Sequence, residues 1–378
     1  MKLFSNNRSK TSRKNPLRQG LAVFMIIALV GVFGLTGCGN NGSSDGDQAV
    51  AETIVFTDDC GREVEIPATI TKCAPSGAVA QMVLMTIAPE SLVGLAATPT
   101  DEQKEFFPDY TWELPEFGQF YGSKANLNME ALLAAEPQVV IDIGDKKPTH
   151  KEDMDKIQEQ TGIPTIFIET TLDKMPDAYR TLGKLFGKEE KGEELAAYIA
   201  NTVETAEKNA SKIPDSEKKT VYYGTGASGL DCNADGSIHA DVIDIIGAKN
   251  AVVGIEASNK GGGTPINMEQ LYNFDPDTIV MTTEGGYDVI AKGDKSWAEL
   301  SAVKNNAYYE IPGAPYCWLS NPPSVNRVLG IWWLGNLVYP DVYDYDMTEK
   351  TIEYYKLFYD YDLSEEDAKA MLENSTYK

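Results

Sequence analysis

Histidine is scarce in this chain of 378 residues, which contains only His150 and His239. Protein sites for a bare zinc or manganese ion usually combine several histidines with carboxylates, so two histidines are too few to enclose such an ion. Cysteine is also scarce, and the spacings of the five cysteines match no zinc-binding signature. We therefore expect no metal site built from protein side chains alone, and no cofactor.

Basic residues are few relative to acidic ones. The chain has 33 Lys and Arg against 57 Asp and Glu, which gives a formal net charge of −24 at pH 7. Because the phosphate backbone of nucleic acids attracts basic surfaces, this balance excludes nucleic acid as an expected partner. The excess of acid is typical of a solvated surface.

The sequence motifs of several common catalytic sites are absent. The string G-x-S-x-G occurs only at residues 42–46, in a polar Gly- and Ser-rich segment that cannot form the strand-to-helix turn of a nucleophile elbow, and there is no H-E-x-x-H pair and no G-K-[ST] phosphate loop. A Ser-His-Asp triad is possible with two histidines, but no motif supports it. We predict that the protein is not an enzyme and has no catalytic residue. A hydrolase or lyase is the alternative from another functional class.

The N-terminus has the order of an export signal. Six basic residues within the first 18 precede an apolar run over residues 21 to 35, which is shorter than the roughly 20 residues of a comfortable membrane span. The run ends in Leu35-Thr36-Gly37-Cys38, which is similar to the bacterial lipobox, in which the cysteine is lipidated. We predict a lipoprotein signal peptide at residues 1–37 and lipidation of Cys38; a single membrane-spanning anchor is the alternative.

A polar segment follows, and it predicts a tether. Residues 39 to 48 contain Gly, Asn, Ser and Asp but no apolar side chain before Ala49, so residues 38–52 cannot form a core. The folded part is therefore expected outside the cytoplasm, held at the cell membrane by its lipid anchor.

The rest of the chain predicts an α/β fold with two lobes. Its length exceeds what one core usually supports. A β-hairpin is expected near residues 53 to 66, followed by short apolar strands near residues 70–74, 92–95, 139–143 and 164–168 that alternate with helices. A strand at 221–223, a Gly-rich loop at 224–229 and a helix at 239–246 repeat this order. Such alternation predicts mainly parallel sheets with flanking helices in an N-terminal lobe (53–187) and a C-terminal lobe (214–378) that ends in helices.

A long helix is predicted between the lobes, over residues 188–213. Apolar residues recur there at helical spacing and lie on one face: Leu195, Ile199, Val203, Ala206, Ala210 and Ile213. Pro214 is expected to end the helix. At about 1.5 Å per residue such a helix could bridge two lobes. An ordinary amphipathic helix on a single core is the alternative.

The two lobes share a sequence repeat. Residues 127 to 132 read Leu-Asn-Met-Glu-Ala-Leu, and residues 266 to 271 read Ile-Asn-Met-Glu-Gln-Leu. In both copies a proline, Pro137 or Pro276, follows the glutamate by seven residues. Two related halves predict a ligand cleft where they face each other.

Together, the lipobox, the tether, the two related lobes and the connecting helix resemble the solute-binding lipoproteins of ABC importers, in the class that carries ferric siderophores, haem and cobalamin. The matching pieces are Lys72-Cys73-Ala74-Pro75-Ser76, Leu114-Pro115-Glu116-Phe117-Gly118 running to Gly122, the two Asn-Met-Glu segments, and residues 322–330. The resemblance implies a monomer that captures a ferric siderophore or related metal chelate and delivers it to a membrane permease and its ATPase. A corrinoid or haem, and molybdate or tungstate, are the alternative ligands.

Candidate ligand-binding residues follow from two arguments. In open α/β sheets, ligands bind beyond the carboxyl ends of the strands, and residues 120 to 122 line the cleft in the family that the chain resembles. The candidates are Pro75, Ser76, Gly77, Phe120, Tyr121, Gly122, Gly226, Ser228, Asn233, Tyr287, Tyr316, Trp318, Asn321 and Arg327.

Several of these candidates have a second interpretation. Ser76 and Ser228 could instead cap helices. The rings of Tyr121, Tyr316 and Trp318 could cover a planar or catecholate ligand, or plug a sheet edge. Arg327 is expected in the first turn of a helix, where a cation opposes the helix dipole and needs an anionic partner. That partner is a bound anion or a structural carboxylate.

Glu130 and Glu269 occupy the same position in the two copies of the repeat. The resemblance implies that one glutamate on each lobe docks to arginines of the permease. A local role is also expected, because an acidic residue in the first turn of a helix stabilises its dipole.

Overall fold

The computed structural model describes residues 52–258, 262–320 and 322–376. The predictions for the export signal, for Cys38, for the tether up to residue 51 and for Asn321 lie outside these residues.

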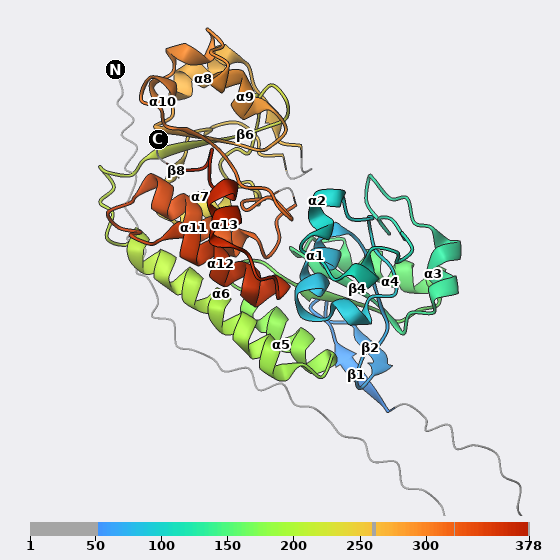
Figure 1. Cartoon of the computed structure of the whole chain (residues 1–378). Helices are drawn as coiled ribbons and strands as arrows, with labels where there is room; N and C mark the ends of the chain where they lie inside the picture. Colours follow the sequence, from blue (N-terminus) through green and yellow to red (C-terminus); the bar gives the residue numbers. More distant parts are fainter. Residues whose placement is uncertain (1–51, 259–261, 321, 377–378) are drawn as a thin grey trace, which may run out of the picture. The chain divides into compact units, whose positions relative to one another are not determined.

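The N-terminal lobe is built on a three-stranded parallel sheet in the order β3-β4-β5 (Figure 1). Its strands are β3 Cys73–Pro75, β4 Val139–Gly144 and β5 Thr165–Glu169. The predicted hairpin precedes them as β1 Thr53–Thr57 and β2 Glu63–Pro67, which pair antiparallel. The helices are α1 Ala78–Ile87, α2 Asp101–Lys104, α3 Met129–Ala135, α4 His150–Thr161 and α5 Met175–Leu185.

The C-terminal lobe contains a six-stranded sheet in the order β11-β10-β6-β7-β9, with β8 paired to β6. The strands are β6 Thr220–Thr225, β7 Asp231–Cys232, β8 Lys249–Asn250, β9 Thr264–Pro265, β10 Thr278–Met281 and β11 Tyr308–Glu310. The helices are α7 Asp241–Ile245, α8 Met268–Phe274, α9 Gly286–Ala291, α10 Ser301–Lys304, α11 Arg327–Val338, α12 Met347–Tyr359 and α13 Glu365–Met371. Strands β6, β8, β10 and β11 are parallel, and the short β7 runs antiparallel to both of its neighbours, β6 and β9. The predicted fold class is therefore confirmed.

The strand predicted at residues 92–95 is wrong. Leu92 forms a single bridge to Cys73, and Leu95 forms a single bridge to Glu116. The segment leaves one neighbour and joins another within four residues, so it never runs beside either. Gly94 lies at the crossing, where the ring of Phe117 occupies the space that a Cβ atom would take.

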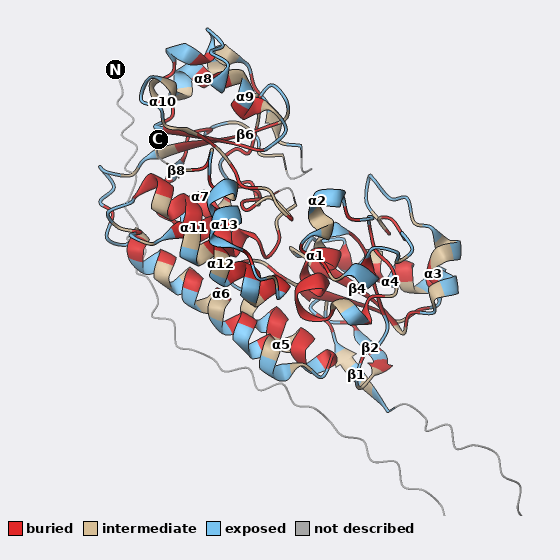
Figure 2. Cartoon of the chain, in the orientation of Figure 1, coloured by how far each residue is buried: buried red, intermediate tan, exposed pale blue. Residues whose placement is uncertain are grey.

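The long helix predicted between the lobes is α6, Glu189–Ala210. It buries Leu195, Ile199 and Ala206, whereas Val203 and Ala210 are half-buried. Figure 2 shows the resulting stripe of buried residues along one side of α6, with exposed residues on the other. The helix packs against α5 and α11. At about 1.5 Å per residue, its 22 residues span roughly 33 Å.

The repeat predicted from sequence has the same local structure in both lobes. Asn128 caps α3 by accepting a hydrogen bond from the Ala131 N–H (3.1 Å), and Asn267 caps α8 by accepting one from the Gln270 N–H (2.9 Å). Both helices have seven residues, bury one leucine, and end at an acidic residue in the left-handed conformation followed by a proline. A strand of the local sheet comes next in each case. The two copies are thus equivalent in structure as well as in sequence.

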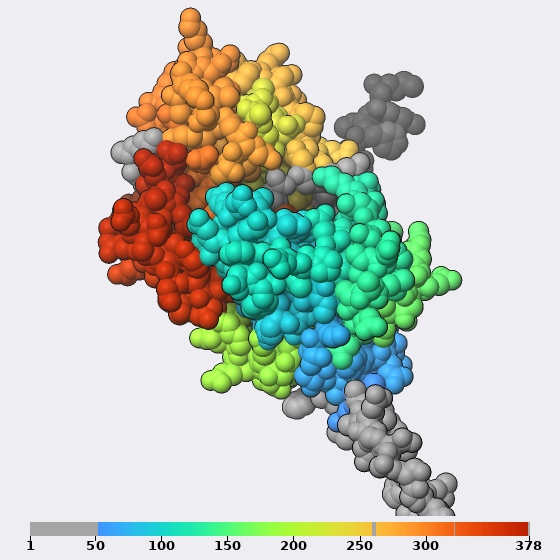
Figure 3. All heavy atoms as spheres, turned by 45° about the vertical axis from the view of Figure 1, so that its right-hand side comes forward, coloured from blue at the N-terminus to red at the C-terminus, as the bar shows by residue number. Residues whose placement is uncertain are grey.

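One continuous apolar core joins the lobes. Its buried residues come from the N-terminal sheet, from α6 and from the C-terminal sheet and helices. Aromatic contacts reinforce the junction, since the ring of Phe106 lies 5.3 Å from that of Tyr355 and 4.9 Å from that of Tyr361. In Figure 3 the red C-terminal segment accordingly lies beside the cyan residues near position 100. The helices after α11 therefore contact both halves of the chain.

Apart from Arg327 and Asn336, helix α11 is apolar, and Figure 2 shows it almost entirely buried. Its Gly330 allows the segment around Trp318 to approach closely, because a Cβ atom at this position would lie 2.1 Å from the Trp318 carbonyl oxygen. This contact positions the chain that leads to Pro322 and Pro323.

Gly330→Ala is expected to lower the free energy of unfolding by about 1–3 kcal/mol, because the added methyl group overpacks this contact. Chemical denaturation measures the change. Its sign is informative, since alanine favours a helix over glycine by about 1 kcal/mol when nothing obstructs it. A more stable Gly330→Ala variant would therefore contradict the close approach.

Candidate functional site

A cavity of about 410 Å³ lies at the carboxyl ends of β3 and β4, where helix N-termini and loops converge. Most of its wall comes from the N-terminal lobe, and the C-terminal lobe contributes a smaller part. The lining includes Ser76 to Ala80, Gln119, Tyr121 to Lys124, Asp142 to Asp145, Lys147, His150, Ile238, His239, Pro322 and Pro323. Both lobes thus shape one pocket, as a ligand cleft between related halves requires.

Asp142 is the polar centre of this pocket. It is almost fully buried within β4, yet both of its carboxylate oxygens have partners. The Ser76 hydroxyl donates to one oxygen, and the Tyr121 hydroxyl donates to the other at 2.8 Å. Burial raises the pKa of Asp142, and these two hydrogen bonds oppose the rise because they favour the carboxylate. Asp142 therefore fixes the side chains of Ser76 and Tyr121.

His150 extends the same hydrogen-bonded chain. Its Nδ1 accepts from the Lys147 backbone N–H at 3.0 Å, so neutral His150 carries its proton on Nε2. Nε2 lies 3.1 Å from the Tyr121 hydroxyl and donates to it. Burial lowers the pKa of His150 and raises that of Tyr121, so both side chains stay neutral near pH 7. The order of donation is His150 to Tyr121 to Asp142.

The remaining walls supply positive charge and an opposing surface. Lys124 and Lys147 are exposed at the pocket and carry cationic groups. On the C-terminal lobe, His239 is buried, with its Nδ1 2.6 Å from the Ser320 hydroxyl oxygen. In a chain with a net charge of −24, two lysines beside one pocket favour an anionic ligand.

The predicted candidates of the N-terminal lobe gather at this pocket. Ser76, Gly77, Tyr121 and Gly122 line it. Pro75 is the buried last residue of β3. Phe120 lies in the apolar core below, with its backbone N–H donating to the Ser76 carbonyl at 2.9 Å. Phe120 therefore does not line the pocket, but it places Tyr121 there.

The glycine-rich candidates of the C-terminal lobe, Gly226, Ser228 and Asn233, do not line this pocket. Strands β6 and β7 pair antiparallel, so the loop between them is a hairpin turn instead of the expected connection to a helix. Within it, the Gly226 N–H donates to the Glu284 carboxylate at 2.7 Å, and the Ser228 hydroxyl accepts from the Leu230 N–H at 3.3 Å. Asn233 is buried after β7. The polar groups of this loop are thus hydrogen-bonded to other residues of the C-terminal lobe.

The aromatic candidates Tyr287, Tyr316 and Trp318 also lie away from the pocket wall. Trp318 has no exposed surface, and its indole N–H donates to the Tyr355 hydroxyl at 3.3 Å. The Tyr316 ring lies 5.8 Å from that of Phe107. The Tyr287 ring lies 5.7 Å from that of Tyr308. Tyr287 and Trp318 are thus buried and Tyr316 is half-buried against the core, and of these candidate tyrosine and tryptophan side chains Tyr121 lines the pocket.

Arg327 is paired with carboxylates of the protein itself, which is the second of the two interpretations given for it. It is buried at the start of α11, and its guanidinium donates to the Asp241 carboxylate at 2.6 Å. Asp145 lies 3.9 Å away on the other lobe. The anion that the helix dipole requires is therefore supplied by the chain itself.

Several pocket residues were missed by the sequence analysis: Gln119, Lys124, Asp142, Lys147, His150 and His239. The signal for Asp142 was present, because a lone carboxylate in an otherwise apolar strand must have buried partners. His150 begins the helix that follows the same strand. The two lysines gave no signal, since exposed lysines occur throughout the sequence.

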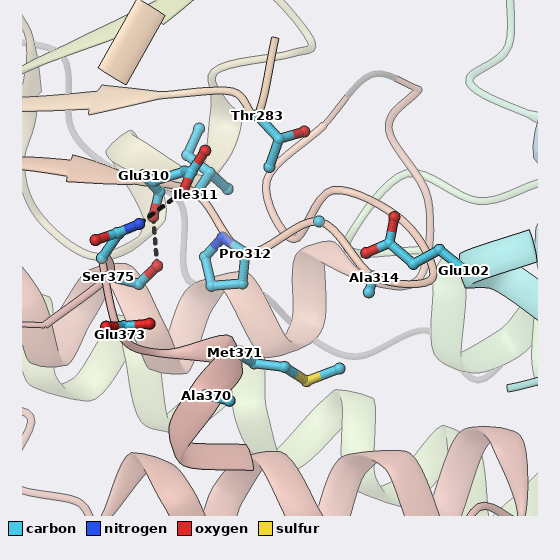
Figure 4. A pocket seen from close by; sticks show the side chains of 12 residues that line it. Glu102, Thr283, Glu310, Ile311, Pro312, Ala314, Ala370, Met371, Glu373 and Ser375 are labelled. Carbon is cyan, nitrogen blue, oxygen red and sulfur yellow. Dashed lines mark hydrogen bonds between the residues drawn. The ribbon is translucent and has the colours of Figure 1, made fainter. Parts of the chain in front are cut away.

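Other hollows fit a ligand less well. Figure 4 shows a smaller cavity of about 230 Å³, where Asn374 and Ser375 hydrogen-bond to Glu310 and fasten the C-terminal segment to β11. It carries the carboxylates of Glu102, Glu310 and Glu373 and no cation. A larger groove of about 1060 Å³ lies at the start of α6, away from the carboxyl ends of the strands. The pocket around Asp142 is therefore the candidate site.

The two glutamates of the repeat lie on the surface. Glu130 and Glu269 are exposed in the first turns of α3 and α8, and neither forms an ion pair within the part of the chain that the structure describes. Three residues further on, Leu133 and Tyr272 are 50% and 40% exposed. Each lobe thus presents a carboxylate and a large apolar side chain at equivalent positions.

Two related α/β lobes, a connecting helix and a pocket lined by both lobes define a two-lobed solute-binding protein. The model of the family described as "Periplasmic binding protein" matches residues 74–315, which is more than half of the chain. The chain belongs to this family, as its sequence pattern predicted.

Three similar proteins illustrate the relationship. The Fe(3+)-citrate-binding protein YfmC of Bacillus subtilis is 23% identical over 195 residues, 50% of this chain and 58% of the relative. The high-affinity heme uptake system protein IsdE of Staphylococcus aureus is 24% identical over 217 residues, 55% of this chain and 70% of the relative. The solved structure of an ABC transporter solute binding protein from Sulfurospirillum deleyianum superimposes with a TM-score of 0.77 at 28% identity, over 84% of this chain and 99% of that one.

The match to the citrate-binding relative thus spans little more than half of that protein's length. All three names describe binding or uptake proteins rather than enzymes. Among the described residues, no helix combines the length and the apolar character needed to cross a membrane.

Proposed function

We propose that this protein is the extracytoplasmic solute-binding component of an ABC importer and that its cargo is an anionic ferric chelate. The observation that carries the proposal is the pocket at the ends of β3 and β4, in which Lys124 and Lys147 lie beside the side-chain amide of Gln119. An anionic chelate finds cations and hydrogen-bond donors there. The iron citrate named for one relative is a cargo of this kind.

The iron is expected to arrive with its own ligands. Within the described ranges, no group of three or more His, Cys, Asp or Glu side chains is arranged to hold a metal ion. In addition, the Tyr121 hydroxyl and the Asp142 carboxylate are already engaged with each other. Recognition therefore acts on the outer surface of the chelate, through Lys124, Lys147 and the neighbouring donors.

Delivery follows from the paired surfaces on α3 and α8. We propose that Glu130 with Leu133, and Glu269 with Tyr272, form two equivalent docking surfaces for a permease with two similar halves. The exposed carboxylates suit basic residues on the permease, and the apolar neighbours suit a dry contact beside them. Lipidation at Cys38, function as a monomer and partnership with an ATPase complete the proposal.

Isothermal titration calorimetry of the soluble chain from residue 50 tests the cargo. Ferric citrate is expected to bind with a Kd in the micromolar range or tighter, with one site per chain. Citrate without iron, haem and molybdate serve as comparisons. Preferential binding of haem or molybdate would show that the cargo belongs to one of those alternative classes and not to the ferric chelates. Binding of none of them would contradict the proposed cargo.

A further inference from the structure

Arg327 joins the two lobes at the edge of the pocket. It belongs to α11 of the C-terminal lobe, and its guanidinium is almost fully buried. On its own lobe it donates to Asp241 at 2.6 Å and to the Ser324 carbonyl at 3.4 Å. On the other lobe its Nη2 donates to the Thr170 carbonyl at 3.3 Å and lies 3.9 Å from the Asp145 carboxylate. One side chain thus contacts two segments of each lobe.

These partners connect directly to the pocket. Asp145 follows β4 and lines the pocket, whereas Asp241 opens α7, two residues after the pocket residue His239. Without Arg327, carboxylates of the two lobes would face each other with no cation between them, and like charges in a partly buried site repel strongly. Burial raises the pKa of Asp241 to about 6, Arg327 opposes this rise, and Asp145 adds to it. The Asp241 carboxylate therefore depends on Arg327 for its charge balance.

The position of Arg327 relative to the dipole of α11 is a second indication that this side chain does more than stabilise the fold. A cation in the first turn of a helix is unfavourable by a few tenths of a kcal/mol or more unless anions offset it. A packed apolar side chain would serve stability at least as well, since replacing buried ion pairs by apolar groups is often neutral or stabilising. A buried ion network that spans two lobes instead fixes how the lobes meet.

We propose that Arg327, with Asp145, Thr170 and Asp241, forms an interlobe clasp that sets the width of the pocket and thereby the affinity for cargo. The predicted effect on cargo affinity rests on the proposed function, whereas the predicted effect on the separation of the lobes does not. Arg327 is a positioning residue here, because it acts on cargo through Asp145 and the pocket wall. Loss of the clasp populates wider states, and apparent affinity falls in proportion to the fraction of competent molecules.

The test compares Arg327→Met and Arg327→Lys with a matched control, Arg62→Met. Arg62 is also buried and ion-paired, but its partners Asp58, Asp155 and Thr165 all belong to the N-terminal lobe. Spin labels are placed at the exposed positions Lys151 and Lys292, one on each lobe, as non-natural amino acids. Their distance distribution is measured without cargo, and the Kd for ferric citrate is measured separately.

Arg327→Met is expected to lengthen and broaden the distance distribution and to weaken ferric citrate binding by roughly 5- to 150-fold. Arg327→Lys should lie between Arg327→Met and the wild type, because a lysine keeps the charge but carries its donors on one nitrogen, which cannot span the four groups that the guanidinium contacts. Arg62→Met should lower the Tm without changing the distance. The clasp is overturned if Arg327→Met gives the same distance between the spin labels as Arg62→Met. If Arg327→Met does not fold, Arg327→Lys takes its place in this comparison. If the distances change as expected but the wild type does not bind ferric citrate, the clasp stands and the cargo assignment fails.

Discussion

Replacing Glu130 and Glu269 together by arginine is expected to abolish cargo delivery while the Kd for ferric citrate changes by less than about twofold. Both carboxylates are exposed, lie outside the pocket and form no ion pair among the described residues, so their removal leaves the binding site unchanged. The reversed charges face the basic residues expected on the permease, and like charges across an interface cost several kcal/mol. Each single variant should retain partial transport, because one docking surface remains.

Transport is measured as uptake of iron-55 from ferric citrate by cells that carry the cognate permease and express only the variant. Glu152→Arg with Glu299→Arg is the matched control, since it makes the same charge change on exposed residues of both lobes outside the repeat. The control should transport normally. Normal uptake by the Glu130→Arg, Glu269→Arg variant would exclude docking through these residues.

Reversing both pocket lysines, with Lys124→Glu and Lys147→Glu, is expected to weaken binding of ferric citrate by about 100-fold, which corresponds to about 2.8 kcal/mol. The substitutions replace two attractions by two repulsions in a pocket that already contains Asp142 and Asp145. High salt should reduce the difference in Kd between the variant and the wild type, because it screens exposed charges. Calorimetry at two salt concentrations measures both effects.

Lys151→Glu with Lys156→Glu is the control for net charge. These two residues are exposed on α4 of the same lobe but do not line the pocket. The control should bind within about threefold of the wild type. If both double variants weakened binding equally, the effect would come from the overall charge of the protein and not from the pocket.

Much of the fold could be predicted because its signals are local. Asn128 and Asn267 cap their helices through the next few residues, and the same short sequence therefore forms the same structure in both lobes. The spacing of Leu195, Ile199 and Ala206 likewise predicted the buried face of α6. The family itself followed from the order of such pieces along the chain.

The site was only half predictable because its C-terminal part depends on non-local packing. The loop after β6 has the composition expected of a ligand-binding loop, but pairing with β7 turns it into a hairpin. Trp318 has the side chain of a ligand cover, but it is fully buried in the core and its indole N–H donates to the Tyr355 hydroxyl of α12. Arg327 was assigned an anion correctly, whereas the sequence could not show that the anion is the carboxylate of Asp241. The contacts that decided the Trp318 and Arg327 cases join residues 37 and 86 positions apart, whereas the β6–β7 pairing joins residues six and eight positions apart.

Crystals of the chain grown with ferric citrate, with diffraction recorded at the iron absorption edge, test the central claim most directly. The account predicts one anomalous iron peak per chain inside the pocket, between the Tyr121 side of the N-terminal lobe and His239 with Pro322 on the C-terminal lobe. An iron peak elsewhere on the protein, or an empty pocket under conditions in which calorimetry detects binding, would contradict it.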